Sequence, residues 1–256
     1  MRNLLVILRY DGRAFHGWQV QKNAVTVMET FQNALESVLG ERPDVKGCSR
    51  TDAGVHAAMY GVSFHTQSGI PCKGLVRALN AALPPAAAAM DCREVEEDFH
   101  ARYCARGKRY VYRIRNSELR DPFWEGLSYR FLPPIDERML NAEAKAFIGT
   151  HDFASFQNAG TNVTDTVRTI FDCAVTRRGE LVEFTVSGDG FLYNMVRVMA
   201  GTLLDISRGV LRPGCVPSVL AAKNRSAAGF TAPACGLMLD EVFYDFETLF
   251  EKEKTP

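Results

Sequence analysis

The chain has 256 residues, of which 46% are hydrophobic and 23% are charged, and its formal net charge at pH 7 is zero. These proportions are ordinary for a globular protein and allow a sizeable core in one large domain or two fused halves. The zero net charge excludes the global positive field that marks many nucleic-acid-binding proteins.

The cysteine and apolar patterns indicate the compartment. Seven cysteines are an odd number and form no C-x-x-C pair, which argues against a disulfide framework or a structural zinc site and predicts a reducing compartment. The apolar run over 4–8 is too short for a signal peptide, and charged residues interrupt the apolar stretch over 191–206. We therefore expect a cytoplasmic protein with no membrane segment.

The distribution of charge is more informative than its sum. Residues 102–115 contain six basic residues and no acidic one, whereas acidic residues collect over 91–98 and 240–253. A neutral chain with one basic strip can still bind a polyanion locally. The members of this strip that we expect to contact an RNA backbone are Arg102, Arg106, Lys108 and Arg109.

The first hundred residues alternate strands and helices. Thr26 and Glu29 form a capping box and Gly40 follows the last apolar position, which predicts a helix over 26–39. The expected elements are a strand over 3–10, that helix, a short segment over 44–49, a strand over 61–66, a helix over 73–83 and a strand over 90–95. The run over 86–89 has no assignment. The order β-α-β-β-α-β is that of a ferredoxin-like unit.

The second half repeats this order. The expected elements are a strand over 108–116, a helix capped by Asp136 and closed by Gly149, a hairpin over 167–176 and 181–187, a helix over 191–206, a short helix over 215–223 and a strand over 236–244. We predict an α+β fold of two ferredoxin-like or RRM-like α/β halves in pseudo-repeat. Antiparallel or mixed sheets would join around a central cleft, with halves at 1–104 and 105–256.

The segment from Cys48 to Ala57 presents one carboxylate, that of Asp52. Gly54 permits the backbone angles of a tight turn, and Arg50 at i−2 lies on the same side of an extended segment as Asp52. This neighbour would lower the pKa of Asp52 and favour its ionised form. A surface turn with an ordinary ion pair is the simpler interpretation of the spacing alone.

Several common catalytic sites have no signature here. The sequence contains no G-x-x-x-x-G-K-[ST], H-E-x-x-H or G-x-S-x-G, the glycines at 188 and 190 lack a third partner, and the five histidines are scattered. No cofactor and no metal are therefore expected. A carboxylate, aromatic residues and arginines suit covalent or acid–base chemistry on the substrate alone.

Two other features have both a functional and a structural interpretation. Tyr110 and Tyr112 lie within the basic strip, a combination that suits single-stranded RNA because rings stack on bases and cations bind phosphates. Both could equally be ordinary strand residues. Arg197 lies beside Asn194 on the polar side of the helix over 191–206, where a solvated arginine is the simpler interpretation.

Taken together, the motifs resemble those of the bacterial tRNA pseudouridine synthase family usually called TruA. Arg50 to Ala57 resembles its signature, and the resemblance continues in order along nearly the whole chain. The other similar segments are Phe15 to Gln19, Phe99 to Arg102 with Lys108 to Tyr112, Gly149 to Phe153 with Ser155 and Phe156, Gly188 to Arg197, and Thr231 to Leu237. Ser49 departs from the glycine that is common before the arginine.

The resemblance implies isomerisation of uridine to pseudouridine at positions thirty-eight to forty of the tRNA anticodon stem-loop, by a homodimer without cofactor or metal. It implies that Asp52 is the essential carboxylate and that Arg50, Tyr110 and Arg197 contact the substrate. A uridine in a stem must be flipped out before a carboxylate can reach its sugar. Whether Asp52 attacks C1′, adds to the base or removes a ribose proton stays open at this point, as does which tRNAs are modified.

Two other classes of protein also fit parts of the pattern. A non-catalytic RNA-binding module on two RRM-like halves would depend on the basic strip and not on Asp52. An aspartate-dependent hydrolase of the glycosidase kind would want a second carboxylate near the first, and the segment from Cys48 to Ala57 has none.

Overall fold

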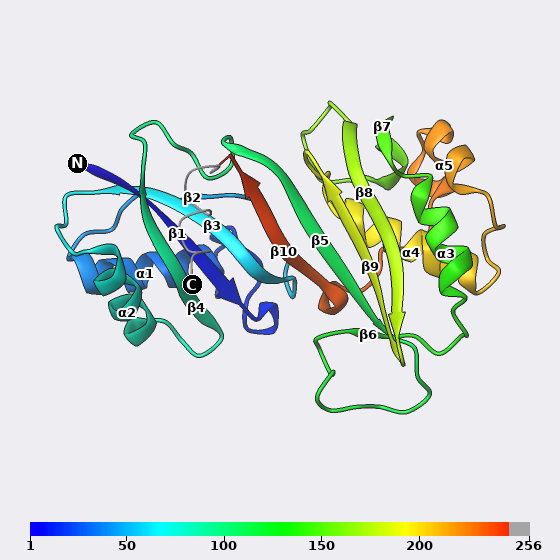
Figure 1. Ribbon diagram of the computed structural model, residues 1–256, viewed down its shortest axis with the longest axis horizontal. Helices are drawn as coiled ribbons and strands as arrows, with labels where there is room; N and C mark the ends of the chain where they lie inside the picture. Colours follow the sequence, from blue (N-terminus) through cyan, green and yellow to red (C-terminus); the bar gives the residue numbers. More distant parts are fainter. Residues whose placement is uncertain (246–256) are drawn as a thin grey trace, which may run out of the picture.

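The computed structural model describes residues 1–245 and shows one continuous mixed sheet with helices packed on it (Figure 1). The strand order is β4-β1-β3-β10-β5-β9-β8-β7, with β2 added to β3 and β6 added to β5. In Figure 1, α1 and α2 lie on the left, α3, α4 and α5 lie on the right, and β10 and β5 lie between the two groups. None of the helices in the described part of the chain is long and apolar enough to span a bilayer.

The N-terminal half has the ferredoxin-like arrangement that the sequence predicts. Its central strand β1 pairs antiparallel with both β3 and β4, which gives the order β4-β1-β3-β2. The elements are β1 (Arg2–Tyr10), α1 (Val27–Leu39), β2 (Lys46–Gly47), β3 (His56–Thr66), α2 (Cys72–Ala82) and β4 (Ala87–Val95).

The C-terminal half repeats the arrangement. Its strands have the order β10-β5-β9-β8, so β5 takes the central place that β1 takes in the first half. The elements are β5 (Ala105–Arg115), β6 (Tyr129–Arg130), α3 (Glu137–Lys145), β7 (Gly149–Asp152), β8 (Val167–Arg178), β9 (Leu181–Gly188), α4 (Met195–Ser207), α5 (Val216–Ala222) and β10 (Leu237–Tyr244). Short 3-10 turns lie at Gly12–Ala14, Ala154–Phe156, Arg225–Ala227 and Ala234–Gly236. The predicted pseudo-repeat is confirmed.

Capping residues explain the ends of two helices. The Thr26 side chain accepts a hydrogen bond from the Glu29 N–H, and Gly40 ends α1 in the left-handed region with φ 71°. The Asp136 carboxylate accepts from the N–H groups of Arg138 and Met139 at the start of α3. These caps are the ones that the sequence predicts.

Several element boundaries differ from the prediction, and strand β3 begins at His56 and not at residue 61. Helix α4 begins at Met195 and not at residue 191, because Asn194 adopts a left-handed conformation with φ 60°. Helix α3 ends at Lys145, and Gly149 with φ 110° opens β7 instead of closing the helix. The unassigned alanine run joins β4, because pairing with the buried strand β1 outweighs the weak strand preference of alanine.

Strand β10 joins the two halves. It pairs parallel with β3 through Met238 and Leu239 and antiparallel with β5 along its length. The Tyr244 hydroxyl also donates to the Ala101 carbonyl at 2.8 Å. The division at 104 and 105 stays a prediction, although β5 begins at Ala105. The acidic terminal segment beyond Asp245 lies outside the described residues.

Candidate active site

A cleft of about 950 Å³ lies where the two halves meet, as predicted. Its walls come from the segments over 16–21, 49–55, 102–110 and 160–163, from Arg168 on β8 and from residues 189–196 before α4. The structure therefore places five predicted site residues on one cavity: Arg50, Asp52, Arg102, Lys108 and Tyr110.

The loop that carries Asp52 is held by the segment after β1. The Thr51 carbonyl accepts from the Trp18 N–H at 3.0 Å, and the Thr51 hydroxyl lies 2.8 Å from the Tyr10 hydroxyl. Gly17 has φ 88°, and a Cβ there would lie 2.6 Å from the Thr51 carbonyl oxygen. Because these contacts fix Thr51 on both sides, the next side chain is directed into the cleft by a rigid backbone.

Asp52 is a half-buried carboxylate with one charged partner. Its side chain is 26% exposed, and its Oδ2 lies 3.1 Å from Nη1 of Arg197. Burial raises the pKa of Asp52, and the Arg197 guanidinium opposes this rise but does not cancel it. The prediction that Arg50 lowers the pKa of Asp52 is therefore wrong, because Arg50 is solvent-exposed and burial dominates.

Arg197 is held in place before any substrate binds. Its Nε donates to the Ala232 carbonyl at 2.7 Å, and its Nη1 donates to Asn194 Oδ1 at 2.6 Å as well as to Asp52. The side chain is only 18% exposed, so the interpretation as a solvated helix arginine is excluded. Asn194 is a site residue that the sequence analysis missed; an asparagine just before a helix tolerates the left-handed backbone observed here.

Tyr110 forms part of the floor of the cleft. It is 5% exposed, its hydroxyl lies 3.2 Å from Ser49 Oγ, and its ring meets the Phe191 ring edge-on with centroids 5.1 Å apart. Burial raises the pKa of Tyr110, so the phenol is protonated at neutral pH. Tyr112 is an ordinary core residue whose hydroxyl donates to the Pro233 carbonyl.

The basic strip divides between the cleft and the outside of the sheet. Lys108 and Arg102 line the cleft, and burial lowers the pKa of Lys108. Arg109 is engaged by Asp240 at 2.7 Å and Glu241 at 2.6 Å, and Arg106 pairs with Asp245. The acidic partners are far away in sequence, which is why the strip looks unpaired when residues 102–115 are considered alone. Arg168 lines the cleft and was not predicted.

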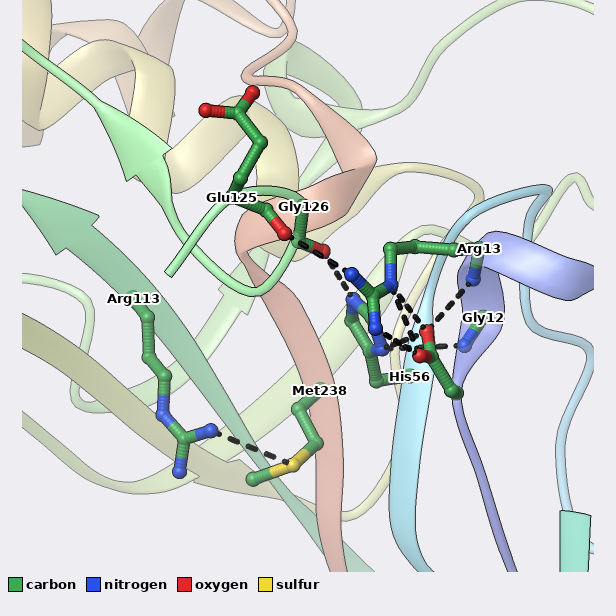
Figure 2. Close-up of polar contacts among 8 residues, drawn as sticks. Gly12, Arg13, His56, Arg113, Glu125, Gly126 and Met238 are labelled. Carbon is green, nitrogen blue, oxygen red and sulfur yellow. Dashed lines mark hydrogen bonds and ion pairs between the residues drawn. The ribbon is translucent and has the colours of Figure 1, made fainter. Parts of the chain in front are cut away.

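His56 ties a distant loop to the strand that follows the Asp52 loop (Figure 2). Its Nδ1 accepts from the Gly12 N–H at 3.1 Å, and its Nε2 lies 3.0 Å from the Gly126 carbonyl oxygen, to which it donates. Burial lowers the pKa of His56 more than Asp11 raises it, so the ring is neutral. Arg13 donates to the Glu125 carbonyl beside this contact. The loop between β5 and β6 is therefore docked next to the site.

No cluster of three or more His, Cys, Asp or Glu side chains within residues 1–245 could hold a metal ion. The chemical groups that line the cleft include the carboxylates of Asp52 and Asp189, guanidinium and ammonium groups, and the protonated phenol of Tyr110.

Comparison with known proteins identifies the family. A family model described as tRNA pseudouridine synthase matches residues 6–104 and 144–245. The tRNA pseudouridine synthase A of Acetivibrio thermocellus is 44% identical over 244 residues, which is 95% of this chain and all of that protein. The proteins of the same name from Ruminiclostridium cellulolyticum and Thermoanaerobacter sp. are 43% and 40% identical, each over 95% of this chain and all of the relative. The chain belongs to the tRNA pseudouridine synthase family.

Proposed function

We propose that this protein isomerises uridine to pseudouridine in tRNA, at positions thirty-eight to forty of the anticodon stem-loop. The observation that carries the proposal is the pairing of Asp52 with Arg197 on a cleft that also holds Tyr110 and Lys108. The names of the full-length relatives support the reaction and the class of substrate.

The reaction rearranges bonds within one nucleotide. The bond from N1 to C1′ breaks, the uracil turns, and C5 forms the new bond to C1′ while the C5 proton leaves and N1 gains a proton. The target must first be flipped out of the stem, and the cleft has room for a nucleotide. Asp52 acts as the ionised carboxylate by attack at C1′, by addition to the base or by removal of a ribose proton.

The surrounding residues have supporting roles. Arg197 favours the ionised form of Asp52 and holds its position. Tyr110 packs on the target base and takes part in proton transfer at C5, with its hydroxyl oriented by Ser49. Arg50, exposed beside Asp52, fills the space that the extruded base leaves.

Phosphate binding in this proposal concentrates on Arg102 and Lys108, which line the cleft. Arg106 and Arg109 were predicted in the same role, and their acidic partners compete with phosphate for them. Their part in RNA binding stays a prediction.

We also propose a cytoplasmic homodimer. A second copy would bring a second set of cleft cations beside the first and so give a neutral chain a longer basic groove. Seven free thiols suit a reducing compartment. Light scattering of the purified protein tests the assembly, and a monomer at micromolar concentration would contradict it.

Tritium release tests the reaction. The protein is incubated with a tRNA transcript that carries tritium at C5 of uridine, and the modified position is then mapped. We expect tritium in water and pseudouridine at the three named positions. A non-catalytic RNA-binding module would bind the transcript without release, and a glycosidase-like hydrolase would free uracil that still carries tritium. Either result would overturn the proposal.

A further inference from the structure

We propose that Tyr103 is a stacking site for an unpaired RNA base next to the target nucleotide, with Arg102 binding the adjoining phosphate. The inference deepens the proposed function, because it names how the rim of the same cleft holds single-stranded RNA. It concerns the turn from Phe99 to Cys104, which lies between β4 and β5.

Tyr103 is an aromatic residue held in solvent. Tyr103 is 77% exposed. The turn that carries it is nevertheless ordered, because the N–H groups of Arg102 and Cys104 both donate to His100. A large ring outside the core contributes little to folding, because it removes little apolar surface from water. Its position therefore points to a ligand that covers the ring.

The turn fixes the ring before any ligand arrives. The Cys104 N–H donates to the His100 carbonyl at 2.9 Å, and the Arg102 N–H donates to His100 Nδ1 at 3.1 Å. The Tyr103 ring packs against the His100 ring, with centroids 4.4 Å apart. The Arg102 guanidinium lies 5.8 Å from the centroid of the Tyr103 ring. A ring that is already ordered loses little conformational entropy on binding.

The location connects the ring to the reaction. Tyr103 lines the same cleft as Asp52, together with Arg102 and Lys108. Phe123 is a useful contrast: it is 86% exposed, lies on the loop between β5 and β6, and is not among the residues of the cleft wall. Only the first of these two exposed rings is therefore placed to meet a nucleotide bound at Asp52.

The chemistry around Tyr103 fits a nucleobase. An aromatic face beside guanidinium and ammonium groups is the combination that binds exposed bases and their phosphates. Removal of one nucleotide from a stack leaves its neighbour with an uncovered face. Tyr103 would cover that face, and because every base has a π-face, the contact would tolerate different sequences.

The test measures binding in the absence of turnover. Full-length Asp52→Asn protein is titrated with an anticodon stem-loop RNA, alone and combined with Tyr103→Ala, Tyr103→Phe or Phe123→Ala. We expect Tyr103→Ala to weaken binding about tenfold, the loss of one stacked base. Tyr103→Phe and Phe123→Ala should bind like the parent. An unchanged affinity for Tyr103→Ala, or an equal loss for Phe123→Ala, would overturn the inference.

An abasic scan then identifies the base. An abasic site at the stacked position should weaken binding to the parent about tenfold and have little further effect on Tyr103→Ala, because both changes remove the same contact. Independent losses at every position would contradict the assignment. If the abasic site and Tyr103→Ala prove independent, the stacking inference fails, but tritium release by the wild type still supports the proposed reaction. If the wild type releases no tritium but the two changes are coupled, only the proposed reaction is refuted.

Discussion

Asp52 and Arg197 show how a single pair of residues sets the acidity of the site. Burial favours the neutral carboxyl group, whereas the proposed chemistry requires the carboxylate. Arg197 reduces this conflict through a contact at 3.1 Å, and Asn194 and the Ala232 carbonyl hold Arg197 in the position to do so. The partner lies 145 residues away, so no pattern near Asp52 could identify it, and only the resemblance of the segment Gly188 to Arg197 to a family motif marked Arg197 as a site residue.

Replacing Arg197 should therefore change the pH dependence of the reaction. In Arg197→Met the pKa of Asp52 rises further, so a smaller fraction is ionised at any given pH. We expect kcat/KM at pH 7 to fall about a hundredfold, as when one preorganised donor is removed, and the deficit to shrink as pH rises. Asn194→Gly keeps the left-handed backbone but removes the side chain that holds Arg197. This variant should shift the acidic limb of the pH–rate profile toward higher pH, as Arg197→Met does, but by a smaller amount. An unshifted acidic limb in Arg197→Met would contradict this account.

The same pKa shift makes a prediction for stability. Because the pKa of Asp52 is raised in the folded state, ionisation of Asp52 opposes folding once the pH exceeds its ordinary value of 3.8. Asp52→Asn should thus have a higher Tm than the wild type at pH 8. The difference should narrow as the pH falls toward 4, because protonation of the wild-type carboxyl group removes the charge that burial disfavours. Thermal melts at both pH values measure this, and a lower Tm for the variant at pH 8 would count against it.

At the level of elements, His56 connects the loop between β5 and β6 to the start of β3. Both ring nitrogens are used, one toward Gly12 and one toward Gly126 (Figure 2). This connection brings parts of both halves of the chain to the side of the Asp52 loop. His56, four residues after Asp52, therefore has a structural role. The sequence alone did not indicate this role, because no other histidine lies near it.

Two substitutions separate the two contacts of His56. Glutamine keeps a donor near the position of Nε2, whereas asparagine keeps an acceptor near that of Nδ1. His56→Asn should leave the Gly126 carbonyl unpaired, lower the free energy of unfolding by about 1–3 kcal/mol and speed amide hydrogen exchange over 116–128. His56→Gln should protect that loop better. Equal exchange in the two variants would show that the Gly126 contact does not hold the loop.

Local patterns predicted most of the elements, and long-range contacts explain the errors. Strand β1 and helix α1 follow from an apolar run and a capping box. The alanines of β4 carry no strand signal of their own and become a strand only beside β1. In the site, Asp52 and Tyr110 were recognised from motifs. The acidic residues that pair with Arg109 could not be recognised in this way, because β5 and β10 are neighbours only in the folded sheet.

In the whole molecule, some basic residues form ion pairs on the sheet and others face the cleft. Acidic side chains on β10 and β9 engage Arg109 and Arg113 on β5, while Arg102 and Lys108 face the cleft. A chain of zero net charge therefore has a locally basic cleft. The last strand, β10, joins the two halves of the sheet. It also carries the acidic side chains that neutralise Arg109.

This division of the basic residues predicts which of them determine the salt dependence of RNA binding. Each phosphate contact contributes about 0.7–0.9 to the slope of log K against log salt concentration. Lys108→Ala should reduce the magnitude of the slope by about that amount, and Arg109→Ala should reduce it by less, because Asp240 and Glu241 compete with phosphate for Arg109. Fluorescence anisotropy of a labelled stem-loop over a salt series measures both. A reduction for Arg109→Ala alone would place the RNA on the opposite face of β5.

In the proposed reaction, Asp52 performs the chemistry and does not serve to bind RNA. The most direct measurement is single-turnover tritium release by Asp52→Asn at saturating protein, with the affinity for the same RNA measured in parallel. We predict no detectable release and an affinity within a few-fold of the wild type. Release at the wild-type rate would contradict the account.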